Sequence, residues 1–163
     1  MALVHKAIPA GGTIKKYLYK NGDQCSSLTG GWQSFTNYGT GGTANFNVDH
    51  IFLKGAPGGN NQKAISTKNK IQIEQYKRIG IKFTFDASSA FPVSFHAAAN
   101  VKMSSGTNVL ADANGADFRI AENFKSRIDG DVIAFFSVLT DAYIIINASN
   151  GAAYKIKEIW LEK

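Results

Sequence analysis

The chain has 163 residues, of which 44% are hydrophobic and 18% are charged. This length suits one domain with a single core, and the charged share is below the roughly 25% that is usual in soluble domains. The longest apolar run, Val132 to Leu139, is interrupted by Ser137 and falls short of the ~20 residues of a membrane-crossing helix. The single Cys25 excludes an intramolecular disulfide, and we interpret it as a small buried thiol rather than a nucleophile.

The first twelve residues, MALVHKAIPAGG, are predicted to form an arm that is separate from the domain over residues 13–163. Their apolar side chains, at Leu3, Val4 and Ile8, are candidates for docking on a partner subunit, and Ala-Gly-Gly ends the segment. The alternative is that the arm adds an edge strand to its own sheet. A lysine and a proline fall where a signal peptide is apolar, so we expect no secretion signal.

The pattern of the first half of the chain predicts short strands separated by turns. Residues 14–19 form the first candidate strand, and Asn21-Gly22 supplies the positive φ angles of a tight turn after it. Residues 32–36 form the second candidate, and the loop NYGTGGT follows.

A change of alternation marks the strand that begins at Ala44. Phe46 and Val48 share one parity, whereas Ile51 and Leu53 share the other. Because each face of a strand repeats every second residue, we expect a bulge or a change of sheet near residues 49–50.

The second half contains the clearest strand patterns. Ile79, Ile81, Phe83 and Phe85 alternate with polar residues and are expected to face the core. Two later runs, residues 132–139 and 142–147, are apolar at successive positions, which predicts burial on both faces and an antiparallel hairpin between them. With no long helical pattern, the chain is predicted to be all-β, a single antiparallel jelly-roll-like β-sandwich of about nine or ten strands.

No catalytic or cofactor site emerges from the motifs. GTGGTA at residues 39–44 satisfies the dinucleotide pattern, but no apolar strand precedes it and no helix is predicted after it. His5, His50 and His96 lack metal-ligand spacing, and adjacent strand positions would turn Asp49 and His50 to opposite faces. We therefore expect no enzyme, no metal and no cofactor.

Sugar binding is the better prospect, because it needs an aromatic plane for the apolar sugar face and polar groups for the hydroxyls. Aromatic and amide side chains lie in or beside the glycine-rich loops, and an arginine lies in a later strand. The candidates are Trp32, Asn37, Tyr38, Asn60, Asn61 and Arg119. The alternative for Trp32 and Phe35 is that they pack in the core beneath the loops.

Basic residues are concentrated between Lys63 and Lys82, and the formal net charge of the chain is +6. Such a cluster is typical of nucleic-acid binding, but only three of the eighteen basic residues are arginine and no recognition motif accompanies them. Lysines at alternate strand positions are also common on solvated edges. We therefore do not expect specific nucleic-acid binding.

Three segments resemble β-sandwich domains in minor structural proteins of phages and prophages of Gram-positive bacteria. They are YLYKNGDQCSSLTGGW at residues 17–32, STKNKIQIEQYKRIGIKFTF at residues 66–85 and AYKIKEIWLEK at residues 153–163. The resemblance implies that the last strand pairs near the first. It also implies a non-enzymatic virion protein, assembled in the bacterial cytoplasm as a decoration, head/tail or baseplate component.

The partners implied by this resemblance are other virion proteins, further copies of the chain in a homo-oligomer and a host cell-wall carbohydrate. Weak glycan binding would gain strength from many displayed copies. The alternative function is a stand-alone carbohydrate-binding module associated with polysaccharide degradation. In either case we expect a protein that binds without catalysis.

Overall fold

The fold is all-β, as predicted. In a computed structural model, the described residues are 14–38, 41–57, 62–76, 78–85, 93–98, 119–124, 132–134, 141–149 and 151–163. They form a single four-residue helix, α1 (Ser26–Thr29), and twelve strands where about nine or ten were expected. The strands are β1 (Lys15–Lys20), β2 (Trp32–Tyr38), β3 (Thr43–Phe46), β4 (Ile51–Lys54), β5 (Gln62–Thr67), β6 (Ile71–Gln72), β7 (Arg78–Phe85), β8 (Val93–Ala98), β9 (Arg119–Phe124), β10 (Val132–Ala134), β11 (Asp141–Ser149) and β12 (Ala153–Glu162).

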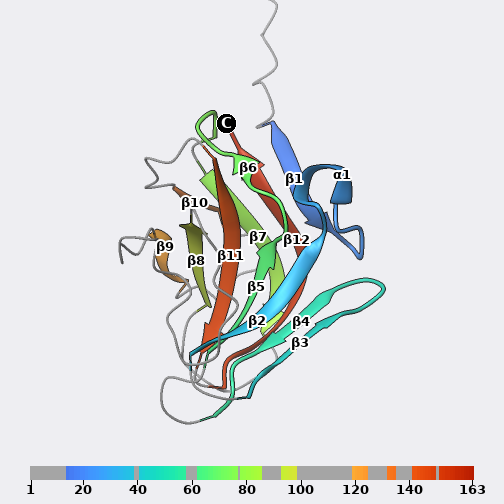
Figure 1. The fold of residues 1–163 in the computed structure, drawn as a ribbon, viewed down its shortest axis with the longest axis vertical. Helices are drawn as coiled ribbons and strands as arrows, with labels where there is room; N and C mark the ends of the chain where they lie inside the picture. Colours follow the sequence, from blue (N-terminus) through green and yellow to red (C-terminus); the bar gives the residue numbers. More distant parts are fainter. Residues whose placement is uncertain are drawn as a thin grey trace, which may run out of the picture.

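The strands make two antiparallel sheets that lie one over the other (Figure 1). One, here called the β12 sheet, has the order β10-β7-β12-β4-β3, and β1 also pairs with β12. The other, the β11 sheet, has the order β2-β5-β11-β8-β9, and β6 also pairs with β11. Lys15 lies opposite Glu162, so the first and last strands are neighbours, as the sequence resemblance implied.

The core lies between the sheets and is dominated by isoleucine. The alternation predicted for β7 is confirmed at Ile79, Ile81 and Phe83, which are 0 to 3% exposed and belong to the main hydrophobic cluster. The side chain of Phe85 lies outside the described residues. Because β-branched and aromatic side chains suit a pleated, half-buried surface, one face of each central strand supplies the core.

β11 is buried on both of its faces, as predicted for residues 142–147. Ile144 and Ile146 join the main cluster, whereas Ile145 packs with Phe35 and Ala64 in a second cluster on the opposite face. The hairpin predicted between the two apolar runs is wrong. β10, which holds the described part of the first run, pairs with β7 in the β12 sheet, whereas β11 pairs with β5, β6 and β8 in the other sheet.

The change of alternation near residues 49–50 is a hairpin rather than a bulge or a change of sheet. Phe46 lies directly opposite Ile51, and β3 and β4 are joined by the turn 47–50 within one sheet. A turn reverses the chain and resets the parity, so Phe46 and Ile51 both contact the core although their positions differ by an odd number.

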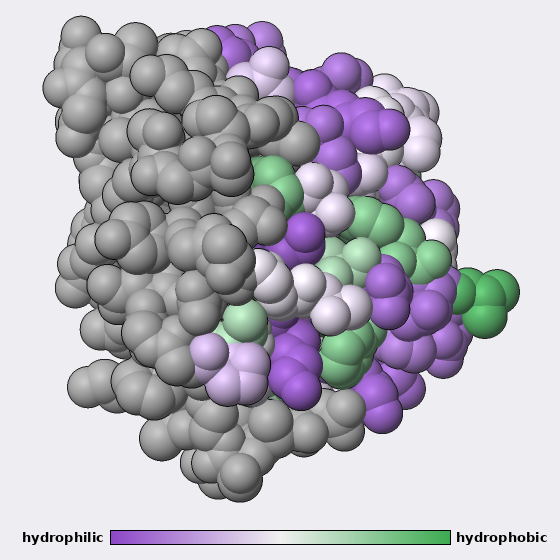
Figure 2. Space-filling view, turned by 60° about the horizontal axis from the view of Figure 1, so that its bottom comes forward, coloured by the Kyte–Doolittle hydropathy of each residue, from purple (hydrophilic) through white to green (hydrophobic). Residues whose placement is uncertain are grey.

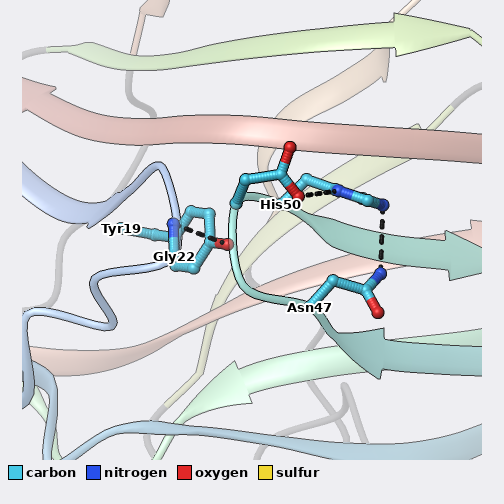
Figure 3. A network of polar contacts seen from close by, with 5 residues as sticks. Tyr19, Gly22, Asn47 and His50 are labelled. Atoms are coloured by element: carbon cyan, nitrogen blue, oxygen red, sulfur yellow. Dashed lines mark hydrogen bonds and ion pairs between the residues drawn. The ribbon is translucent and has the colours of Figure 1, made fainter.

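The turn after β1 meets the turn of this hairpin. Asn21 and Gly22 have φ angles of 47° and 96°, as their predicted tight turn requires, and the Gly22 N–H donates to the hydroxyl of Tyr19 at 3.0 Å (Figure 3). A Cβ built on Gly22 would lie 1.9 Å from the carbonyl oxygen of Val48. Glycine is therefore required for both its backbone conformation and its close approach.

Two further expectations concern Cys25 and the N-terminal arm. Cys25 is half-buried rather than buried, and partial burial raises the pKa of its thiol, which favours the protonated form. The arm at residues 1–12, with Leu3, Val4 and Ile8, lies outside the described residues. Within the part of the chain that the structure describes, no helix is long and apolar enough to cross a membrane.

Candidate functional site

Trp32 is a core residue, which corrects its assignment as a sugar-stacking candidate. Only 3% of its surface is exposed, and its indole Nε1 donates to the carbonyl oxygen of Leu18 at 2.9 Å. Phe35 is likewise buried, at 5% exposure. Neither ring offers a face to a ligand, so the alternative interpretation of both residues as packing residues is the correct one.

The other sequence candidates belong to the β11 sheet or lie outside the described residues. Position 38 ends β2 opposite Gln62, with Asn37 at the register shift beside it, and position 119 begins β9 opposite His96. β2 and β9 are the two ends of this sheet's strand order, so the fold brings these candidates to one sheet but to opposite edges. The side chains of Asn37, Tyr38 and Arg119 are outside the described residues, as are Asn60 and Asn61 altogether.

The outer face of the β11 sheet, which points away from the core, carries an apolar cluster. Phe35, Ala64 and Ile145 are buried there, and half-buried Tyr143 packs against them. Beside this cluster, the side-chain amide of Gln33 donates to the hydroxyl of Ser66 at 3.2 Å. The polar groups at this point are therefore already bonded to one another.

The outer face of the β12 sheet has a different character, with aromatic and charged side chains in rows across the strands. The register gives the rows, because residues directly opposite each other in a sheet share a face. From one end to the other, the rows are Lys15, Glu162, Arg78 and Ala134; Tyr17, Trp160, Gly80 and Val132; Lys20, Glu158 and Lys82; Asn45, Phe52, Lys155 and Thr84; and Thr43, Lys54 and Ala153.

Trp160 anchors one end of this face. Its ring is 2% exposed and packs over Gly80, and its Nε1 donates to a carboxylate oxygen of Glu162 at 2.7 Å. The Tyr17 ring lies beside it at a centroid distance of 6.3 Å, and the Lys15 ammonium sits 4.2 Å above the indole. Tyr17 remains half-exposed, so it is the member of this group that a ligand can reach.

Phe52 provides a second accessible aromatic ring further along the same face. It is only partly buried, and the register flanks it with exposed Asn45 on β3 and half-exposed Lys155 on β12. Exposed Thr84 follows on β7 in the same row. An aromatic ring between an amide, an ammonium and a hydroxyl combines the two kinds of contact that a sugar needs.

The described lysines of the basic cluster in the sequence are divided between the two sheets. Lys82 lies on β7 in the β12 sheet, whereas Lys63 lies on β5 in the β11 sheet and Lys68 and Lys70 follow β5. Lys70 pairs with Asp141 at 3.8 Å. The outer face of the β12 sheet instead gathers lysines from separate segments of the chain, which no local pattern in the sequence could reveal.

Asp49 and His50 are bonded directly, which corrects the expectation that they point to opposite faces. They lie in a turn rather than a strand, and a carboxylate oxygen of Asp49 is 2.6 Å from His50 Nδ1 (Figure 3). This bond holds the pKa of Asp49 below its usual range. The other ring nitrogen of His50 bonds the amide of Asn47 at 3.0 Å rather than a hydroxyl or thiol. The arrangement braces the turn.

On the face shown in Figure 2, the described apolar residues form small groups. These groups are bordered by hydrophilic residues. Among the described residues, the exposed large hydrophobic side chains are Ile14 and Val48, at 67% and 92% exposure. No group of three or more histidine, cysteine, aspartate or glutamate residues in the described segments is arranged to hold a metal ion.

Solved structures with the same fold include carbohydrate-binding modules. A carbohydrate-binding module of family 29 from Piromyces equi has a TM-score of 0.53 at 13% identity, with 93% of this chain and 92% of the module covered. A point mutant of a family 29 module has a TM-score of 0.56 at 12% identity, with 92% of each chain covered. At such low identity these similarities establish a shared fold alone.

The enzymatically active domain of tailspike protein 4 from bacteriophage CBA120 is more distant. It has a TM-score of 0.47 at 12% identity, and the match covers 90% of this chain but 21% of that chain. A similarity at this level carries no argument for a phage role. No protein-family model matches the sequence, and a search of curated proteins finds no match.

Proposed function

We propose that this chain is a non-catalytic carbohydrate-binding module whose ligand lies along the outer face of the β12 sheet. The fold shared with family 29 carbohydrate-binding modules supports the proposal, since it is a fold on which sugar binding occurs. A fold alone does not define a function, so the residues of the face must carry the argument.

The main support for this proposal is that two rows of one sheet each contain an accessible aromatic ring with polar neighbours. Tyr17 and Phe52 are both partly exposed, and their rows cross β12 at Trp160 and Lys155. On β7 these rows are at Gly80 and Thr84, and four strand steps of about 3.3 Å separate them by roughly 13 Å, a span suited to more than one sugar unit. The rigid sheet holds both rings in place before a ligand binds, which lowers the entropic cost of binding.

Affinity electrophoresis through gels that contain soluble polysaccharides tests the proposal. Replacing Phe52 by Ala should weaken binding roughly tenfold, because the substitution removes an aromatic contact of about 1 kcal/mol together with its buried apolar area. Tyr143→Ala is the matched control, since Tyr143 is a partly exposed aromatic residue on the outer face of the β11 sheet.

The two variants separate the possible sites. Loss of binding with Tyr143→Ala and not with Phe52→Ala would move the site to the β11 sheet, where the sequence candidates at positions 38 and 119 lie. If no polysaccharide in the gel slows the migration of the intact chain, the proposed function is refuted. Thermal melts of both variants establish that each is folded when it is assayed.

Display on a phage particle is a further part of the proposal, and it rests on the sequence resemblance of residues 17–32, 66–85 and 153–163. The shared fold suits a stand-alone carbohydrate-binding module equally well. Mass spectrometry of purified particles from an induced host distinguishes the two roles, because a virion protein must co-purify with capsid and tail proteins. Sedimentation of the purified chain tests the homo-oligomer that the virion role implies.

A further inference from the structure

We infer that the ligand of the outer face of the β12 sheet is an anionic polysaccharide, one whose sugars carry carboxylate or acidic ester groups. This inference rests on the proposed function and specifies its ligand. It comes from the charges on the face rather than from the fold, and it concerns residues that are far apart in the sequence.

Five lysines converge on this face from four strands. The register places two on β1 and one each on β4, β7 and β12, namely Lys15, Lys20, Lys54, Lys82 and Lys155. All of them are exposed or half-exposed. They lie in four of the five described rows, so positive charge runs along the whole face instead of gathering at one point.

Among the described residues, the carboxylates of the same face offset little of this charge at its surface. Glu162 is 4% exposed and accepts the indole N–H of Trp160, so it is withdrawn from a ligand. Glu158 is half-buried between Lys20 and Lys82 in the register, and the structure shows no ion pair with either of them. Asp23 and Asp49, in the two neighbouring turns, accept bonds from Cys25 and His50 within those turns.

Two of the ammonium groups are held beside the aromatic rings. Lys15 lies 4.2 Å above the Trp160 ring, and Lys20 lies 4.4 Å above the Tyr17 ring. A cation over a ring is positioned by the ring's quadrupole and still has N–H donors for a second partner. Tyr17 therefore presents an apolar surface and a fixed positive charge together, which matches a sugar with an apolar face and an anionic substituent.

The positive charge of the face indicates an anionic ligand. The type and spacing of its cations and aromatic rings favour a polysaccharide over a nucleic acid. Apart from Arg78 in the end row, the cations that the register places on this face are lysines, spread along a flat sheet that carries accessible rings in two of its rows. Arginine is the side chain that dominates base and phosphate recognition through bidentate bonds, and the register brings a single arginine, Arg78, to the end row of this face opposite Glu162. Double-stranded DNA is accordingly a competitor in the test.

The test compares polysaccharide pairs that share a backbone and differ in charge. Polygalacturonate is paired with its methyl ester, and dextran sulfate with dextran, and binding is measured by affinity electrophoresis at low and high salt. We expect one or both acidic members to bind in a salt-sensitive manner, and their neutral partners to bind at least tenfold more weakly. If only polygalacturonate binds, the face recognises carboxylates; if only dextran sulfate binds, it recognises sulfate esters.

Two triple variants with the same loss of charge locate the binding. Lys20→Gln with Lys54→Gln and Lys82→Gln removes three charges from the outer face of the β12 sheet. Lys63→Gln with Lys68→Gln and Lys70→Gln removes three from the β11 sheet and the turn after β5. We expect the first triple to weaken binding of the acidic polysaccharide roughly tenfold, from three surface pairings of about 0.5 kcal/mol each, and the second to leave it nearly unchanged.

Each contrary outcome overturns the inference in a recognisable way. Equal losses from the two triples would indicate general attraction to a basic protein, and tighter binding of the neutral members would exclude an anionic ligand while the proposed function survives. Salt-sensitive retention on double-stranded DNA that the first triple abolishes would assign the face to nucleic acid. If the first triple variant does not fold, the comparison of acidic and neutral polysaccharides with the intact chain still shows whether the ligand is anionic. Absence of binding to any polysaccharide would refute both proposals.

Discussion

Gly80 lies beneath the indole of Trp160, across the pairing of β7 with β12. A Cβ built on Gly80 would be 2.1 Å from Cε2 of that ring, which is too close for two non-bonded carbon atoms. The missing side chain lets the indole lie close against the sheet, where it is 2% exposed and bonded to Glu162. A glycine in the middle of a strand is thereby explained by packing rather than by a turn.

Replacing Gly80 by Ala should lower the free energy of unfolding by about 1–3 kcal/mol, because the added methyl group forces the indole away from the sheet. Urea denaturation followed by fluorescence measures the change. In a Trp160→Leu background the same substitution should cost less, since the smaller side chain leaves room for the methyl group. Identical costs in the two backgrounds would show that the indole is not the obstacle.

Replacing Phe83 by Ala should lower the free energy of unfolding by about 3–5 kcal/mol. Phe83 is 3% exposed in the main cluster, and its ring makes an edge contact with Tyr154 at a centroid distance of 5.4 Å. Val48→Ala is the contrasting variant, because Val48 is 92% exposed and should change stability by less than about 0.5 kcal/mol. Thermal denaturation of both compares them, and a small effect at Phe83 would mean that the core is packed differently.

Alkaline pH should destabilise the wild type more than a Tyr19→Phe variant. Burial raises the pKa of Tyr19 above its ordinary 10.0; the bond from the Gly22 N–H lowers it, and the charge of Asp49 raises it further. A raised pKa favours the neutral form in the folded state, so the stabilisation is complete below pH 10 and is lost as pH rises through the folded-state pKa.

Comparing the two proteins isolates this effect, because the remaining tyrosines are common to both. The difference in free energy of unfolding between wild type and Tyr19→Phe should be largest near neutral pH and should shrink above pH 10. Denaturant titrations at a series of alkaline pH values measure it. A difference that stays constant across this range would place the Tyr19 hydroxyl in contact with water.

Features that depend on near neighbours in the chain were predictable from sequence. The alternation of Ile79, Ile81 and Phe83 correctly identified the core face of β7, because a strand's side chains alternate whatever it packs against. The Asn21-Gly22 turn followed from the positive φ angles that these residues tolerate. Burial of β11 on both faces followed from its continuous apolar run.

Features that depend on pairing partners were not predictable in the same way. The parity change near Asp49 was compatible with a bulge, a change of sheet or a hairpin, and only the partner of Phe46 distinguishes them. The role of Trp160 on the outer face of the β12 sheet could not be predicted, because the residues around it belong to β1 and β7. Trp32 was ambiguous because a tryptophan beside a diglycine suits both a ligand platform and a core.

By itself, the sequence determined that the chain is built of strands, where several of them run and which of their faces are apolar, since those properties arise from steric preferences and from burial within a few residues. The tertiary structure decided which strands are neighbours. It thereby placed Lys15, Lys20, Lys54, Lys82 and Lys155 on one face and put Lys63 in the other sheet, because the position of a charge in space follows from strand order and register.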